Sequence, residues 1–222
     1  MAFAFDAANT GVTENDTNAQ TTFSITIGSG ADRLFVLWAA WSTTTTTISN
    51  ANIGGTTLVR ADGQAVNRGT DIWYCYDPPS GAQTVTINYS ANAGRVCAGG
   101  HSWTGANSSQ TPQTVTASGT SAAPGGTCGT GTDELIIDCV GISFTAGETI
   151  SVDADQTERG NITGGATRGA SSSQLGSAGG VMSWTNSASK AWGYVAASFD
   201  AAAAAGDAVP VAWAQYRQRR VT

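Results

Sequence analysis

The side chains that could perform acid or base chemistry are few and lie far apart in the sequence. There are four glutamates, Glu14, Glu134, Glu148 and Glu158, and each falls in an expected loop or at the edge of an expected strand. A glycosidase uses two carboxyl groups about 5 to 9 Å apart, and residues distant in sequence can supply them. The sequence leaves such a pair open but favours carboxylates without a catalytic role.

His101 is the one histidine, so a serine or cysteine nucleophile activated by histidine would have to use it. Its neighbours Gly99, Gly100 and Trp103 are typical of a packed strand, and we therefore expect a buried packing residue. The glycine clusters are not followed by an expected helix, so they do not predict a phosphate-binding loop. We predict that the chain is not an enzyme.

The cysteines show no metal-binding spacing. They are Cys75, Cys97, Cys128 and Cys139, with neither a CxxC motif nor a histidine partner at ligand spacing. We expect free thiols, mostly buried, as is usual for cytoplasmic synthesis. The alternative to consider is a bridge between Cys75 and Cys97, which lie on neighbouring expected strands.

Two other features could bind a ligand. Asp153 and Asp155 could offer carboxylates to a structural calcium ion, although the loop spacing of an EF-hand is missing. Tryptophans could form a sugar-stacking platform, but most lie inside strand patterns, where core burial is the expected use. They are Trp38, Trp41, Trp73, Trp103, Trp184, Trp192 and Trp213. We predict no cofactor and no metal, and leave a surface glycan open.

The composition points to an unusually uncharged surface. Charged residues make up 12% of the 222 residues, against about 25% in ordinary soluble domains, and the formal net charge is −6. The polar surface must therefore consist largely of Thr, Ser, Asn, Gln and Gly, most of which lose less rotamer entropy when covered than Lys or Glu. Such a surface suits permanent contacts. A nucleic-acid partner is not expected, and no apolar run approaches the roughly 20 residues that span a bilayer.

The stretch 70–105 organises the expected fold. Residues 71–77 form a β-prone run, residues 83–90 alternate strictly between apolar and polar, and residues 95–103 form a third strand. The turn signals between them are DPPSG and ANAG. Short connections of this kind predict an antiparallel meander.

The rest of the chain reads as further strands. Residues 33–41 and 134–144 are apolar on both faces, which predicts strands covered on two sides. Residues 157–170 read as a glycine-rich loop, and only residues 201–205 could be helical. We expect an all-β, two-layer antiparallel β-sandwich of about ten to twelve short strands, with one domain at 1–200 and a C-terminal extension at 201–222.

The patterns also predict a core. We expect one contiguous core between the two sheets, containing nine residues from the expected strands. They are Val36, Trp38, Ile72, Tyr74, Val85, Ile87, Val96, Ile137 and Val195.

The order of segments resembles a known group of domains. An N-terminal FAFDAA, TFSITIGSGADRLFVLW, IGGTTLVRADG, IWYCYDPPSGAQTVTINYS, AGGHSWTGANSSQTP and ELIIDCVGISF together resemble jelly-roll-like β-sandwich domains of tailed-phage virion proteins, also seen in bacterial surface proteins. The resemblance implies a capsid decoration or head-fibre component of the virion, made in the host cytoplasm. The alternative is a tail, tail-tip or host-recognition carbohydrate-binding module, because fold alone does not decide function.

The C-terminal extension departs from the resemblance. We expect it to dock on a neighbouring subunit, with apolar residues packing and three arginines pairing with acidic groups. The residues concerned are Val209, Val211, Trp213, Tyr216, Arg217, Arg219 and Arg220. The expected partners are other copies of the chain, with a trimer favoured, and other virion proteins such as the major capsid protein. An edge strand added to its own domain is the alternative, and no membrane partner is expected.

Overall fold

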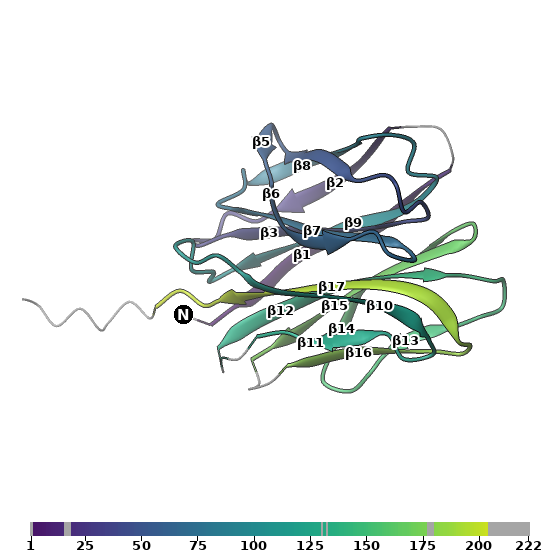
Figure 1. Ribbon diagram of the computed structural model, residues 1–222. Helices are drawn as coiled ribbons and strands as arrows, with labels where there is room; N and C mark the ends of the chain where they lie inside the picture. The colour runs from purple at the N-terminus through teal and green to yellow at the C-terminus, as the bar shows by residue number, and fades with distance from the viewer. Residues whose placement is uncertain (1, 16–18, 130, 132, 177–179, 204–222) are drawn as a thin grey trace, which may run out of the picture.

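The computed structural model describes residues 2–15, 19–129, 131, 133–176 and 180–203. In these ranges the chain forms strands and no helix, and every strand pairing is antiparallel (Figure 1). The predicted all-β antiparallel sandwich class is confirmed.

The first half of the chain forms two sheets. Its strands are β1 (Ala4–Asn15), β2 (Gln20–Ile27), β3 (Leu34–Trp41), β4 (Ile48–Ile53), β5 (Thr56–Thr57), β6 (Val59–Gln64), β7 (Gly69–Tyr76), β8 (Gly81–Tyr89) and β9 (Arg95–Thr104). Strands β1-β9-β3-β7-β6 form the first inner sheet, and β2-β8-β4-β5 form the first outer sheet.

The second half forms two more sheets. Its strands are β10 (Gln113–Ser121), β11 (Gly125–Thr127), β12 (Glu134–Ser143), β13 (Ile150–Val152), β14 (Thr157–Gly164), β15 (Thr167–Leu175), β16 (Val181–Asn186) and β17 (Lys190–Asp200). Strands β10-β17-β12-β15-β14 form the second inner sheet, and β11-β16-β13 form the second outer sheet.

The two halves repeat one topology. In each half the first strand pairs with the last, the second with the second-to-last, and the third with the third-to-last. The short β5 is the one strand of the first half without a counterpart. Figure 1 shows the first half above the second, with the two inner sheets facing each other. Each half is thus a two-layer sandwich, and the two sandwiches are stacked.

Three apolar layers hold the four sheets together. The first core lies between the first outer and first inner sheets, the second core between the two inner sheets, and the third core between the second inner and second outer sheets. All nine predicted core residues are buried. The prediction of one contiguous core is wrong, because Val85, Ile87 and Val96 lie in the first core and the other six lie in the second.

Strand β3 explains this division. Successive side chains of a strand point to opposite faces, so its apolar run on both faces supplies two cores at once. Phe35 and Leu37 enter the first core, whereas Val36 and Trp38 enter the second. Strand β12 does the same between the second and third cores, as the prediction of strands covered on two sides required.

The predicted loop at 157–170 is wrong, because these residues form most of the hairpin β14–β15. Gly165, with a φ of 58°, forms the turn of this hairpin, whereas other small residues in it are required by close packing. A Cβ added at Gly169 would lie 2.5 Å from the Cβ of Cys97, and Ser171 and Ser172 are fully buried. The described residues contain seventeen strands, more than the ten to twelve expected. The excess comes from strands such as β14 and from several strands of only two or three residues.

Candidate functional site

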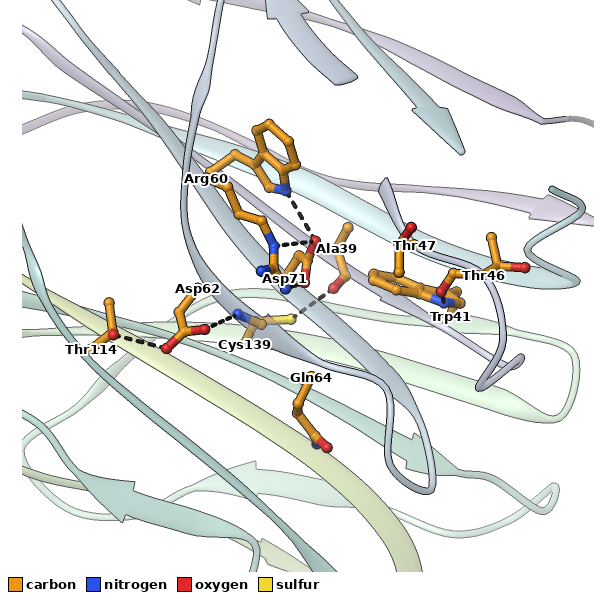
Figure 2. Close-up of polar contacts among 12 residues, drawn as sticks. Ala39, Trp41, Thr46, Thr47, Arg60, Asp62, Gln64, Asp71, Thr114 and Cys139 are labelled. Atoms are coloured by element: carbon orange, nitrogen blue, oxygen red, sulfur yellow. Dashed lines mark hydrogen bonds and ion pairs between the residues drawn. The ribbon is translucent and has the colours of Figure 1, made fainter. Parts of the chain in front are cut away.

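Buried Asp71 forms an ion pair with the exposed Arg60 on the first inner sheet. Its carboxylate accepts hydrogen bonds from Arg60 Nη2 at 2.9 Å, Arg60 Nε at 3.2 Å and Trp73 Nε1 at 3.1 Å (Figure 2). Burial raises the pKa of Asp71, and the Arg60 guanidinium opposes that rise. The bidentate contact ties β6 to β7, and Gly63 leaves room for the carboxylate that a Cβ would displace.

Polar contacts from β6 and from the loop that follows it also join the two halves of the chain. Asp62 accepts a hydrogen bond from Thr114 Oγ1 at 2.9 Å, which Figure 2 shows, and Gln64 Nε2 donates to the carbonyl of Ala117 at 2.9 Å. Asn67 Nδ2 donates to the carbonyl of Gly119 at 3.1 Å. These side chains therefore hold β10 of the second half against β6 of the first.

Asp138 is the centre of a buried polar cluster between the second inner and second outer sheets. It accepts hydrogen bonds from Ser172 N at 2.7 Å, Ser172 Oγ at 2.8 Å and Trp184 Nε1 at 2.7 Å. Desolvation raises its pKa to about 7 against the effect of these three donors. The sequence prediction missed this residue, although a charged residue inside an otherwise apolar strand was a visible signal.

His101 is fully buried, as the prediction of a buried packing residue required, and it lies opposite Val36 of the second core. Its Nε2 is 3.4 Å from Ser171 Oγ, and that hydroxyl donates to the backbone carbonyl of Asp138 at 2.6 Å. Burial lowers the pKa of His101 to about 3. Because the ring and the hydroxyl are both enclosed, a solvent-borne substrate does not reach them in this conformation.

The glutamates are dispersed. Glu148 pairs with Lys190 at 2.7 Å, Glu158 accepts a hydrogen bond from Asn161 at 2.8 Å, and Glu134 accepts one from the backbone N–H of Gly131. The side chain of Glu14 lies outside the described residues. The structure shows these described carboxylates in local structural contacts, from three different strands and connections.

The expected calcium ligands are separated in their roles. Asp153 accepts hydrogen bonds from the hydroxyls of Ser183 at 2.5 Å and Thr185 at 2.9 Å. Asp155 occupies the following turn with a φ of 69°. Within the described residues, no group of three or more His, Cys, Asp or Glu side chains gathers as metal ligands would.

All four cysteines are free and buried, and this prediction is confirmed. Cys75 belongs to the first core and Cys97 to the second, so the two thiols lie on opposite faces of the first inner sheet. Burial raises the pKa values of Cys97 and Cys128 to about 11. The thiols therefore stay protonated at neutral pH, which makes them poor nucleophiles.

The aromatic residues are used mainly in the core. The six described tryptophans are all buried, as predicted, and Trp213 lies outside the described residues. Among the described residues, Phe5 is the exposed large aromatic, at 42% of its surface. Its ring packs edge to face with Trp103 and lies 3.9 Å below the Arg159 guanidinium.

An open cavity lies where the described chain ends. It has a volume of about 150 Å³, and apolar residues Phe3 and Leu175 line it together with Asp133 and Glu134. A neighbouring cavity of about 310 Å³ shares the same acids and adds Asp200. The seven residues expected to dock on a neighbour (Val209, Val211, Trp213, Tyr216, Arg217, Arg219 and Arg220) lie outside the described residues.

No protein-family model, curated protein or solved structure matches this chain. In the part of the chain that the structure describes, no helix has the length and apolar character needed to cross a membrane.

Proposed function

We propose that this chain is a non-enzymatic structural protein of a bacteriophage virion, as a capsid decoration or head-fibre component. The observation that carries the proposal is the first outer sheet, whose four strands contain no Asp, Glu, Lys or Arg. Its solvent face carries hydroxyl and amide side chains instead. They are Gln20, Thr22, Ser24, Thr26, Ser49, Asn50, Thr57 and Thr84.

This face suits a permanent contact on energetic grounds. Covering a charged side chain costs several kcal/mol of desolvation unless it is paired, whereas hydroxyls and amides can exchange water for protein hydrogen bonds at little cost. Short side chains such as Thr and Ser also lose little rotamer entropy. A sheet built in this way is suited to being covered by a neighbouring subunit.

The topology supports the resemblance to jelly-roll-like domains. Pairing of the first strand with the last and the second with the second-to-last describes a long hairpin that is rolled up, which is how a jelly roll is built. Here the arrangement occurs twice in one chain. The reactive side chains are used in folding, since His101 and Asp138 are enclosed and the thiols are buried.

The C-terminal residues are the proposed anchor to a neighbour, either another copy in a homo-oligomer or a protein such as the major capsid protein. The cavities beside Ala201 offer the complementary chemistry, because Phe3 and Leu175 are apolar while Asp133 and Asp200 are acidic. Val209, Val211, Trp213 and Tyr216 match the apolar pair, and Arg217, Arg219 and Arg220 match the acidic pair.

A deletion of residues 207–222 tests this proposal. Native virions would be assembled with the truncated chain in place of the full chain, and its amount in purified particles measured by quantitative mass spectrometry. We expect a folded sandwich that no longer incorporates. A second variant replaces Arg217, Arg219 and Arg220 by glutamine and keeps the length of the chain. We expect it to incorporate less than the native chain at low salt, and this difference to shrink as the salt concentration is raised. Normal incorporation of the truncated chain would exclude the anchor, and absence of the full chain from native particles would exclude the virion function.

The second candidate is a tail or host-recognition module that binds carbohydrate, and exposed Phe5 beside Arg159 is the feature that favours it. Aromatic rings stack on sugar rings through their apolar faces. A glycan array with the native chain and a Phe5→Ala variant separates the two functions, because only a carbohydrate-binding module would show binding that this variant loses.

A further inference from the structure

The described chain ends at Ala203, beside the two open cavities. Ala201 lines both of them. It forms a β-bridge with Ala106, and Ala202 N donates a hydrogen bond to the Gly105 carbonyl at 2.8 Å. These contacts tie the last described residues to the first half of the chain. The segment 204–222 therefore starts from a fixed point at the edge of the cavities.

The smaller cavity exposes apolar surface to solvent. Phe3 and Leu175 line it, and Leu175 is exposed over 55% of its surface at the end of β15. Ala2, which is also exposed, lines the same cavity. Removing apolar surface from water is favourable, so apolar side chains of suitable size would bind here.

The larger cavity is acidic. Asp133, Glu134 and Asp200 line it together with Asn107. Among the described residues, neither Asp133 nor Asp200 forms an ion pair, and Asp133 is exposed. Guanidinium groups fit such carboxylates because they can form two parallel hydrogen bonds with each one. The two cavities together therefore suit a partner that is apolar in one part and rich in arginine in another.

The segment 204–222 has this composition. Its apolar residues come first and its arginines follow, in the order Val209, Val211, Trp213, Tyr216, Arg217, Arg219 and Arg220. Val209 comes six residues after Ala203, which allows a reach of about 20 Å at full extension. Because the segment starts at the edge of the cavities, its side chains can reach them without the displacement of any described strand.

Attachment to the same chain favours the chain's own cavities over those of a neighbour. A group that is tethered by a short linker has an effective concentration at its site in the millimolar range. Residues 204–208 are such a linker between Ala203 and Val209. A neighbour's cavities reach a comparable local concentration only after the chains have been brought together. Before assembly, the segment therefore meets its own cavities first.

We propose that residues 209–220 of the free chain fold back into the cavities of the same chain, and that assembly exchanges this contact for the identical contact with a neighbouring copy. The apolar residues cover Phe3 and Leu175, and the arginines pair with Asp133 and Asp200. Exchange of an identical element between copies keeps its contacts and therefore costs little free energy. The closure also covers the apolar residues of the segment until assembly begins, which limits premature association. The exchange rests on the proposed anchor, whereas the closure of the free chain does not.

Disulfide cross-linking within the full chain tests the closure. The native thiols are all buried, so cysteines introduced by Ala2→Cys and Ala214→Cys are the accessible pair. Ala2 lies at the cavity, and Ala214 lies between Trp213 and Tyr216 without being one of the docking residues. Under mild oxidation we expect a monomer that has lost two hydrogen atoms, identified by intact mass, which forms at a rate independent of protein concentration.

Ser80→Cys in place of Ala2→Cys is the matched control. Ser80 is exposed and lines neither of the two cavities. It follows the end of β7, which pairs with the start of β3, as does the end of β9 beside Ala4, so Ser80 and Ala2 lie at the same end of the sheet. The Ala2→Cys chain should cross-link at least tenfold faster. Equal rates, or a product that is only a dimer, would overturn the closure.

Removal of the acidic groups provides a second measurement with the same cross-link. Asp133→Asn combined with Asp200→Asn should slow cross-linking of Ala2→Cys to Ala214→Cys at least threefold at low salt. Asp77→Asn is the control, because Asp77 is exposed outside both cavities and asparagine tolerates its φ of 50°. This control should leave the rate unchanged. An equal rate in the native background and in the double variant contradicts the pairing of the arginines with these acids.

Incorporation into particles separates the closure from the anchor. Preferential cross-linking within one chain, together with normal incorporation of the chain that lacks residues 207–222, would leave the closure standing and remove the anchor. Lost incorporation of the truncated chain without preferential cross-linking would remove the closure and leave the anchor. Both effects together support the exchange.

Discussion

Asp138 and His101 are both fully buried, and burial favours the neutral form of each. The pKa of Asp138 rises to about 7 and that of His101 falls to about 3. Their effects on stability therefore run in opposite directions with pH. The folded state holds a proton on Asp138 that the unfolded state releases near pH 4, so this group stabilises the fold at low pH and the stabilisation is lost as pH rises through about 7. Neutral His101 stabilises above about pH 6.5, and that contribution is lost as pH falls toward 3.

We predict that Asp138→Asn removes the first of these dependences. Asparagine can still accept from Ser172 but loses the acceptor for Trp184 Nε1, so the variant should be less stable by about 1 to 3 kcal/mol at low pH. Between pH 4 and 7.5 the native chain should then lose on the order of 4 kcal/mol relative to the variant, since one pH unit corresponds to about 1.4 kcal/mol per proton.

Urea denaturation of both chains across that pH range gives the difference directly. The contribution of His101 is common to both chains and cancels. A constant difference in unfolding free energy from pH 4 to 7.5 would show that Asp138 is ionised throughout, with its three donors outweighing desolvation.

At the scale of elements, the long strands β2 and β8 of the first outer sheet bury side chains on one face only. Strand β8 alternates, with Val85, Ile87 and Tyr89 buried and Thr84 exposed. Strand β15 is different, because its small side chains fit where two inner sheets approach closely. Alternation therefore marks strands that border solvent. Apolar runs such as β3 and runs of small residues such as β15 mark strands enclosed on both faces.

We predict that Ile87→Ala lowers the unfolding free energy by about 2 to 5 kcal/mol, because it leaves a cavity in the first core beneath β8. Thr84→Ala is the matched control on the same strand, and should change the free energy by less than about 0.5 kcal/mol. Chemical denaturation measures both. An unchanged melting temperature for Ile87→Ala would mean that the register of β8 is wrong.

At the scale of the whole molecule, the second core joins the two halves of the chain. Leu34, Val36 and Trp38 from the first inner sheet meet Leu135 and Ile137 from the second, all fully buried. An isolated half would expose this face to water. Large exposed apolar patches of that kind destabilise soluble proteins and promote aggregation.

We predict that the two halves unfold in one transition. Differential scanning calorimetry should give a van't Hoff enthalpy equal to the calorimetric enthalpy under dilute conditions. Residues 2–106 expressed alone should be aggregated or should melt well below the full chain, because the second core is missing. Two separated transitions in the full chain would show that the halves are independent domains.

The sequence by itself determined the fold class, the burial of the tryptophans and cysteines, and the presence of three strands in residues 70–105. These features follow from local patterns: alternation, turn residues and runs that are apolar on both faces. The run 33–41 even predicted a strand covered on two sides, and β3 contributes to two cores. The predicted antiparallel meander of the three strands in residues 70–105 is wrong, because β8 lies in the first outer sheet while β7 and β9 lie in the first inner sheet with β3 between them.

Tertiary structure decided the stacking of two sandwiches, the division of the core and the buried polar contacts. A strand that is apolar on both faces predicts that both faces are covered, but its sequence does not indicate which sheets cover them. The hairpin β14–β15 has weak alternation because glycine and serine are selected by the close approach of Cys97 and Ala40, which lie far away in the sequence. The same reason applies to Asp138 and Asp71, whose roles depend on Trp184 and Arg60. Only the folded chain brings these partners within hydrogen-bonding distance.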